Sequence, residues 1–140
     1  MYTKQEISKQ KQAFWTAFGR YMKPVLSADS EAISWLNYKT GIKQVSFKME
    51  VDSKEAEISI VLHDPAYYER FVQLKGMLYA ELGEDDWAWV PPSLIQKKLT
   101  GVNIFRNEDW PAIISFLKPR IIALDSFWSL VKDAITDMGG

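Results

Sequence analysis

The sequence predicts an α+β domain in which helices cover one face of a mostly antiparallel sheet of about five strands. Two segments, 44–51 and 55–62, alternate between apolar and polar residues and are joined by a short polar link. This pattern is typical of a β-hairpin with one buried face. Three other segments carry apolar residues at helical spacing. The 140 residues contain no linker, repeat or low-complexity tract, so we expect a single domain over residues 1–140.

The first helix is predicted to begin after Thr3, which forms a Thr-x-x-Glu capping box with Glu6. Apolar residues then recur on one side of the helix until Pro24, which ends it. We expect a short first strand at 33–38, and the hairpin then supplies the second and third strands.

The second half of the chain is predicted to add two helices and two strands. Asp64 and Pro65 are a typical helix start, and the helix that follows is expected to end at Gly83. A fourth strand is predicted at 87–90 and a fifth within 99–105. With the last helix, the order of elements is α-β-β-β-α-β-β-α.

The last helix, which is expected to have Asp109 or Asn107 as its cap, carries two apolar stripes. The longer stripe continues for about seven turns. The shorter stripe beside it includes Phe116, Phe127 and Leu130. Pro119 lies inside the helix, where it removes one backbone hydrogen bond and is expected to kink the axis. A helix with two apolar stripes lies either in the core or at an interface, so these three residues are interface candidates.

Trp87 and Trp89 lie two residues apart in the expected fourth strand, so both rings point to the same face of the sheet. On the face covered by helices they would pack in the core. On the open face, beside Lys43 and Lys48, they would form a stacking platform or part of an interface. We favour the covered face because three aromatic-rich helices must pack there, and we keep the surface role as the alternative.

Landmarks of a known family are spread over nearly the whole chain. They are Phe14-Trp15 with Phe18, Thr40-Gly41-Ile42, Tyr68-x-x-Phe71 with Lys75, Leu82-Gly83 with Trp89, and Asp109-Trp110-Pro111. Together they resemble the bacterial family called domain of unknown function 4268, in particular its short standalone members typical of Bacteroidetes. In other relatives a similar domain follows a nuclease-like domain, which hints at DNA-related work by association. The resemblance implies one α+β domain and brings no established activity or catalytic residue.

The composition excludes several kinds of site. The chain has no Cys, which rules out disulfides, thiolate catalysis and zinc–cysteine sites. Its polar N-terminus lacks a signal-peptide core, and no apolar run approaches the roughly 20 residues that span a bilayer. We therefore expect a cytoplasmic protein with no membrane contact. His63, the only histidine, has no triad or metal-ligand spacing around it, so no catalytic residue is assigned.

Four carboxylates crowd one end of the predicted hairpin: Glu50, Asp52, Glu55 and Glu57. Hard cations such as Mg²⁺ bind oxygen ligands, so these residues are candidates for a metal-dependent hydrolase. We favour the alternative that they are exposed charges protecting a solvent-facing sheet, and we expect no metal or other cofactor. A two-residue hairpin loop would place Glu50 opposite Glu57, where like charges repel.

Basic residues suggest another function. The net charge of −1 gives no global field for nucleic acid. Cations in the first 48 residues could nevertheless follow a phosphate backbone. These nucleic-acid candidates are Lys9, Arg20, Lys23, Lys43 and Lys48.

The expected function is a non-enzymatic interaction or accessory module that binds a protein partner or a second copy of itself. The alternative is an accessory nucleic-acid-binding domain linked to nuclease or DNA-processing systems. A metal-dependent hydrolase that uses the hairpin carboxylates comes third.

Overall fold

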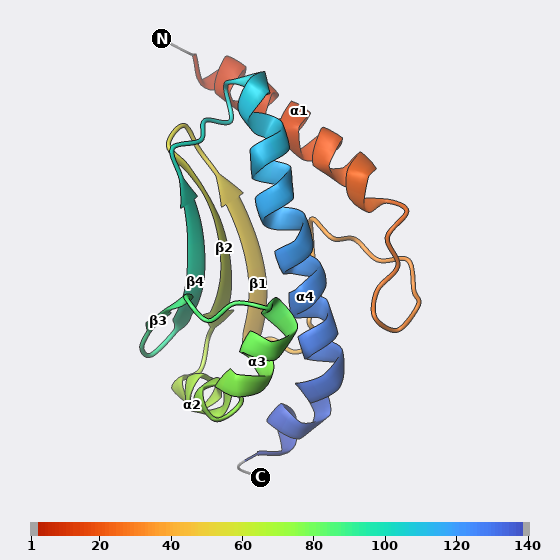
Figure 1. Cartoon of the computed structure of the whole chain (residues 1–140), viewed down its shortest axis with the longest axis vertical. Coiled ribbons are helices and arrows are strands. Elements are labelled where there is room, and N and C mark those ends of the chain that lie inside the picture. The colour runs from red at the N-terminus through yellow and green to blue at the C-terminus, as the bar shows by residue number, and fades with distance from the viewer. Residues whose placement is uncertain (1–2, 139–140) are drawn as a thin grey trace.

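The sheet is built outward from the predicted hairpin. In a computed structural model that describes residues 3–138, β1 (Val45–Val51) pairs with β2 (Glu55–Leu62). On the far side of β2 follow β4 (Leu94–Thr100) and then β3 (Ala88–Val90). The order is β1-β2-β4-β3 and every neighbouring pair is antiparallel. Strands β1 and β3 therefore form the two edges of the sheet (Figure 1).

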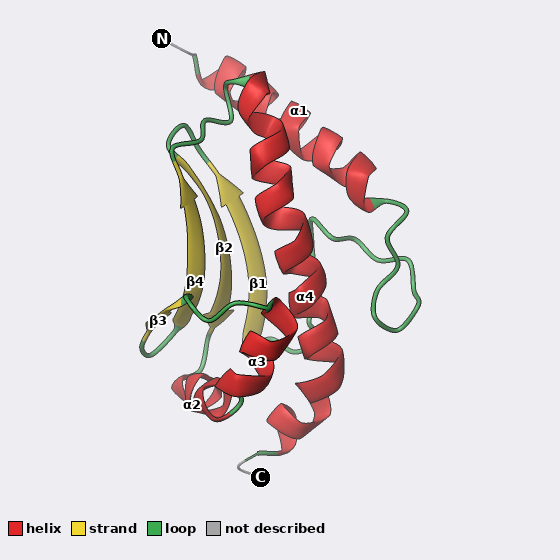
Figure 2. Cartoon of the chain, viewed as in Figure 1, coloured by secondary structure: helices red, strands yellow, loops and turns green. Residues whose placement is uncertain are grey.

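The described helices gather on one side of this sheet (Figure 2). They are α1 (Lys4–Met22), α2 (Pro65–Gln73), α3 (Lys75–Leu82) and α4 (Trp110–Asp137), which follows a short 3₁₀ turn at Asn107–Asp109. The α+β class and the antiparallel sheet are confirmed. At the start of α1, Thr3 Oγ1 accepts a hydrogen bond from the Glu6 N–H at 3.1 Å, as the capping pattern predicts.

The register of the strands determines what each face carries. Phe47 lies opposite Ile60, Ile60 opposite Ile95, and Ile95 opposite Trp89. Residues directly opposite one another share a face, so these apolar side chains lie on one surface. Helix α4 packs over that surface against β2 and β1. The other face carries mostly polar side chains, among them Ser46, Lys48, Glu50, Glu57, Ser59, Gln96 and Lys98.

In the described residues the sheet has four strands rather than about five, because the strand predicted at 33–38 does not form. This segment belongs to the long connection 23–44, which has no strand or helix of its own. Trp35 is buried, and its indole Nε1 donates to the carbonyl of Val25 at 3.0 Å. The apolar residues of the segment thus fasten a loop to the core instead of pairing with a strand.

The last strand was predicted too late in the chain. It covers Leu94–Thr100 rather than a stretch within 99–105, and it stops at Gly101, which has a φ of +78°. That left-handed conformation turns the chain out of the sheet, and glycine adopts it at little cost.

The helix predicted from Asp64 to Gly83 is divided in two. Leu74 leaves helical geometry with a φ of −103° and a ψ of 13°, and Gly76, two residues later, has low helix propensity. Gly83 ends α3 in the left-handed conformation, as predicted. By contrast, α4 continues as one helix through Pro119.

Candidate interaction site

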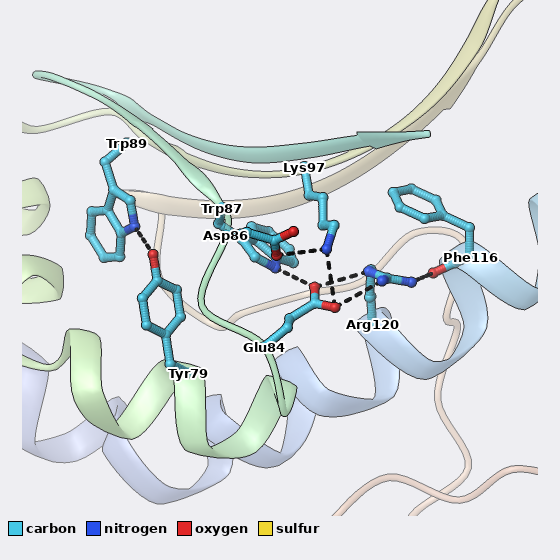
Figure 3. Close-up of polar contacts among 8 residues, drawn as sticks. All are labelled: Tyr79, Glu84, Asp86, Trp87, Trp89, Lys97, Phe116 and Arg120. Carbon is cyan, nitrogen blue, oxygen red and sulfur yellow. Dashed lines mark hydrogen bonds and ion pairs between the residues drawn. The ribbon is translucent and has the colours of Figure 1, made fainter. Parts of the chain in front are cut away.

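Trp87 and Trp89 both lie on the helix-covered side of the sheet. Trp89 is opposite Ile95, and Trp87 is 5% exposed. The Trp87 indole donates to Glu84 Oε2 at 2.6 Å, and the Trp89 indole donates to the Tyr79 hydroxyl at 2.8 Å (Figure 3). Trp87 thus lies in the core and bonds to the segment after α3, and the Trp89 ring packs against Tyr68 of α2 and Tyr79 of α3. A stacking platform on the open face is not formed.

Glu84 is the centre of a group of charges that joins the sheet to α4 (Figure 3). Its carboxylate accepts two hydrogen bonds from Arg120, at 2.8 and 3.1 Å, and pairs with Lys97 at 3.2 Å. Lys97 also pairs with Asp86 at 2.7 Å. Burial by itself would raise the pKa of Glu84, but hydrogen bonds from Arg120, Trp87 and Lys97 outweigh it and hold the pKa below its usual value. This arrangement is a structural clamp.

The structure buries most of the predicted interface residues within the chain itself. Phe116 and Phe127 on α4 are buried, as Trp87 is, and Trp89 is half-buried. Leu130 is 63% exposed. Of the shorter stripe on α4, Leu130 is the interface candidate that reaches the surface.

The hairpin loop has two residues, Ser53 and Lys54. The Asp52 N–H donates to the Glu55 carbonyl at 3.0 Å. In turn, Asp52 Oδ1 accepts from the N–H groups of Lys54 and Glu55, at 2.8 and 2.9 Å. These two hydrogen bonds lower the pKa of Asp52. The side chain of Asp52 therefore shapes the turn.

Glu50 lies directly opposite Glu57, as a two-residue loop requires. Burial raises the pKa of Glu57, Lys98 on the neighbouring strand opposes that rise, and Glu50 adds to it. Glu55 forms an ion pair with Lys98 at 3.1 Å. Within residues 3–138, no group of three or more metal-ligating side chains is placed to hold a metal ion. The four carboxylates therefore share one end of the sheet, where Asp52 shapes the turn and Glu55 pairs with Lys98.

The five candidate nucleic-acid residues do not share one surface. Lys9 and Arg20 are exposed on α1, and Lys23 follows its last residue. Lys48 points to the open face of the sheet, away from the side on which the helices gather, and Lys43 is exposed in the loop before β1. His63 is exposed at the end of β2, where its Nε2 lies 3.1 Å from Ser46 Oγ. That contact ties two strand ends together.

Asp125, which anchors the long connection to α4, was not among the residues predicted from the sequence. Asp125 is 6% exposed, and it accepts from the Ala28 N–H at 2.7 Å and from the Tyr38 hydroxyl at 2.6 Å. Burial and Asp125 both raise the pKa of Tyr38. The one feature of the sequence that could have pointed to Asp125 is the presence of an aspartate within an apolar seam. Its hydrogen-bond partners lie about 90 residues earlier in the chain.

A polar pocket of about 820 Å³ lies between this connection and α4. Several of its wall groups are already paired with each other, such as Ser129, which donates to Asp29 at 2.9 Å. Both carboxylate oxygens of Asp125 are likewise occupied. The polar walls thus serve first to hold the loop on the helix.

The outer edge of β1 is a row of backbone groups unpaired within residues 3–138, on which Met49 is half-buried and Phe47 and Val51 are each 6% exposed. The Asp52 N–H donates to Glu55, and the His63 N–H donates to the Gln44 carbonyl at 2.9 Å. Because backbone direction alternates along an antiparallel strand, even-numbered residues of β1 bond to β2 and odd-numbered residues point outward. Among residues 3–138, none pairs with the outward N–H and C=O groups of Phe47, Met49 and Val51. We call these three residues the β1 edge.

Two features distinguish the β1 edge from its surroundings. At its N-terminal end, the Val45 carbonyl is already occupied, because the Thr40 hydroxyl donates to it at 2.7 Å. At its other end lies a groove of about 310 Å³ between the strand and α1, lined by Met49, Val51, Trp15 and Lys11 together with the four hairpin carboxylates. The β1 edge therefore borders an apolar wall on one side and charged side chains on the other.

Comparison with known families identifies one match. The model of a family described as a domain of unknown function, DUF4268, matches residues 10–132. This range includes β1 and most of α1 and α4. No curated protein and no solved structure matches the chain significantly. In the described residues, no helix has the length and apolarity needed to span a membrane.

Proposed function

The chain belongs to the family described as domain of unknown function DUF4268, and within it we propose a non-enzymatic interaction module. Its β1 edge binds an extended segment of a protein partner by strand addition. The observation that carries this proposal is the row of outward backbone groups at Phe47, Met49 and Val51, which have no partner in residues 3–138.

Strand addition fits the chemistry of the β1 edge. An extended segment would pair with its N–H and C=O groups, and each hydrogen bond contributes about 0.5–1.5 kcal/mol net. Alternate side chains of the segment would point to opposite faces. Those on the covered face would meet Trp15 and Met49 in the groove, and those on the open face would meet Lys48 and Glu50.

Edge strands are usually protected by proline, a bulge, extreme shortness, charged side chains or a covering element. Of these devices, β1 carries the charged side chains of Lys48 and Glu50. Strand β1 has seven residues, no proline, and continuous one-to-one pairing with β2. At the opposite edge, β3 has three residues and is followed by two prolines. The long, regular edge at β1 therefore favours a binding role there.

Nucleic-acid binding and metal-dependent hydrolysis have less support. The basic candidates do not form one surface, because Lys48 lies next to Glu50 on the open face and the candidate cations of α1 lie on the helix side. The hairpin carboxylates shape the turn and pair with Lys98. The cytoplasmic location also remains part of the proposal, and the cysteine-free sequence supports it.

Selection from a library of random displayed decapeptides tests the proposal. We expect the wild-type chain to enrich peptides that bind it, and Met49→Pro to lose at least about tenfold in affinity for them. Proline removes the outward N–H and blocks an added strand, yet it is tolerated on an edge strand.

Thr100→Pro is the matched control, because the Thr100 N–H points away from β2 at the other side of the sheet, beyond the residues that pair with β3. This variant should bind the peptides like the wild type. If no peptide is enriched, or if Met49→Pro binds as well as Thr100→Pro, strand addition at β1 is wrong.

A further inference from the structure

We propose that the segment bound at the β1 edge is β1 of a second copy of this chain, paired antiparallel about Met49. The inference rests on the proposed function, since it uses the same edge, and it names the partner. The two sheets would join into one continuous sheet of eight strands around a two-fold axis.

The self-pairing follows from which residues can face each other. In an antiparallel pair with hydrogen bonds between the outward residues, odd-numbered residues of one copy face odd-numbered residues of the other. With Met49 on the axis, Met49 faces Met49 and Phe47 faces Val51. All three residues of the β1 edge would then be hydrogen-bonded on both copies.

Charge selects this register. With Met49 on the axis, Lys48 of each copy faces Glu50 of the other. These pairs are the ones without hydrogen bonds between them, where side chains come closest. An axis at residue 48 would place Lys48 against Lys48, and an axis at residue 50 would place Glu50 against Glu50. Like charges directly opposite each other are unfavourable, so both neighbouring registers are disfavoured.

Registers displaced further are also worse. An axis at Val51 would set Glu50 against Asp52. An axis at Phe47 would pair Val45 with Met49, although the Val45 carbonyl is already bonded to Thr40. The Met49 register uses only backbone groups that have no partner within residues 3–138 and brings opposite charges together.

The neighbours of Glu50 add a further argument. Within one chain, Glu50 faces Glu57 on β2, and this repulsion contributes to the raised pKa of Glu57. Pairing about Met49 would place the ammonium of a second Lys48 on the other side of Glu50. The second copy thus supplies the positive charge that Glu50 lacks among its cross-strand neighbours.

The groove fits the same arrangement. It runs beside Met49 and Val51 and is closed on the helix side by Trp15, which is half-buried. In the Met49 register, the side chains facing this groove from the second copy are Phe47 and Met49. They are apolar, and they match the exposed part of the Trp15 ring.

The test uses sedimentation of the full chain over a range of concentrations. We expect the wild type and Thr100→Pro to dimerise, and Met49→Pro to be monomeric. Lys48→Glu and Glu50→Lys should each weaken the dimer by at least about tenfold, since each places like charges opposite each other. Circular dichroism melting checks that every variant is folded.

Mixing and the double variant together provide the register-specific result. In a mixture of Lys48→Glu with Glu50→Lys, every facing pair at the two positions joins a carboxylate to an ammonium. The mixture should therefore form a heterodimer, and the double variant Lys48→Glu/Glu50→Lys should dimerise by itself. No register with an axis at residue 48 or 50 predicts this combination.

Three results would overturn the inference: a wild type that stays monomeric at the highest concentration, a dimer that survives Met49→Pro, or single variants that form no complex when mixed. A monomeric wild type that still binds selected peptides at β1 would refute the second copy as partner and keep strand addition. Loss of both would refute the proposed function as well.

Discussion

Glu84 is the side chain on which three parts of the chain converge. It connects Arg120 of α4, Lys97 of β4 and the indole of Trp87 (Figure 3). The side chains of Glu84 and Arg120 are each 20% exposed. A charge pair this protected from solvent leaves an uncompensated charge when one partner is removed, which costs more than losing a surface ion pair.

Glu84→Ala is therefore expected to lower the free energy of unfolding by roughly 1–3 kcal/mol at pH 7, measured by urea denaturation. Asp86→Ala is the matched control, because Asp86 also binds Lys97 but its side chain is 66% exposed. We expect the control to leave stability close to that of the wild type. Equal effects of the two substitutions would contradict the central role of Glu84.

The difference between wild type and Glu84→Ala should also depend on pH. The pKa of Glu84 in the folded chain lies below its ordinary value of 4.5, so folding favours the carboxylate. Its electrostatic stabilisation is fully present above pH 4.5 and is lost as pH falls through the folded pKa. Repeating the denaturation at pH 3 should shrink the difference, and a difference that grows would refute this assignment.

Single residues differ in how far the sequence predicted their surroundings. That Trp89 shares one side of the sheet with Trp87 followed from strand alternation, which depends only on neighbours in the chain. The hydrogen bond between Trp89 and Tyr79 did not, because it depends on where α3 packs. Asp125 was missed for the same reason, since its partners are distant in sequence.

The connection 23–44 is the element that departs most from the expected fold. Loops this long without secondary structure are uncommon in compact domains, and this one is fixed to α4. Asp125 holds it through Ala28 and Tyr38, and the Trp128 indole donates to the Thr40 carbonyl at 2.7 Å. Since Thr40 in turn bonds to Val45, the loop also sets where β1 begins.

Asp125→Ala is expected to release the middle of this loop. The Ala28 N–H loses its acceptor, so its hydrogen exchange should accelerate by at least about tenfold, and global stability should fall by roughly 1–3 kcal/mol. NMR-detected exchange measures the first effect. Tyr38→Phe is the control, because it removes one hydrogen bond and leaves the acceptor of Ala28 in place. Equal exchange of Ala28 in both variants would contradict this account of the anchor.

Elements with a strong local signal were predicted well. The hairpin and the carboxylate pair opposite each other follow from alternation and loop length alone. The segment 33–38 was mistaken for a strand because Ile33, Trp35 and Tyr38 pack a loop against the core rather than a strand into the sheet. The break at Leu74 was missed because apolar residues recur at helical spacing on both sides of it, in α2 and in α3.

For the molecule as a whole, the consequence of this fold is an asymmetric sheet. One edge ends in a short strand and two prolines, and the other is β1. The sequence predicted a sheet with one face covered by helices. It did not predict that β1 lies at an edge, because this follows from the strand order β1-β2-β4-β3. That order arises because β4 pairs with β2 across more than 30 residues, and no local pattern encodes it.

If two copies pair through β1, unfolding of the molecule is linked to dissociation. The melting temperature of the wild type should then rise with protein concentration, because mass action stabilises the dimer by about 1.4 kcal/mol for each tenfold increase. Differential scanning calorimetry over a hundredfold range of concentration measures this. Thr100→Pro should keep the concentration dependence, whereas Met49→Pro should lose it, since its unfolding no longer involves a second copy. Under conditions where sedimentation detects a dimer, the melting temperature of the wild type could instead be independent of concentration. This result would contradict a dimer that is held together by the folded β1 edge.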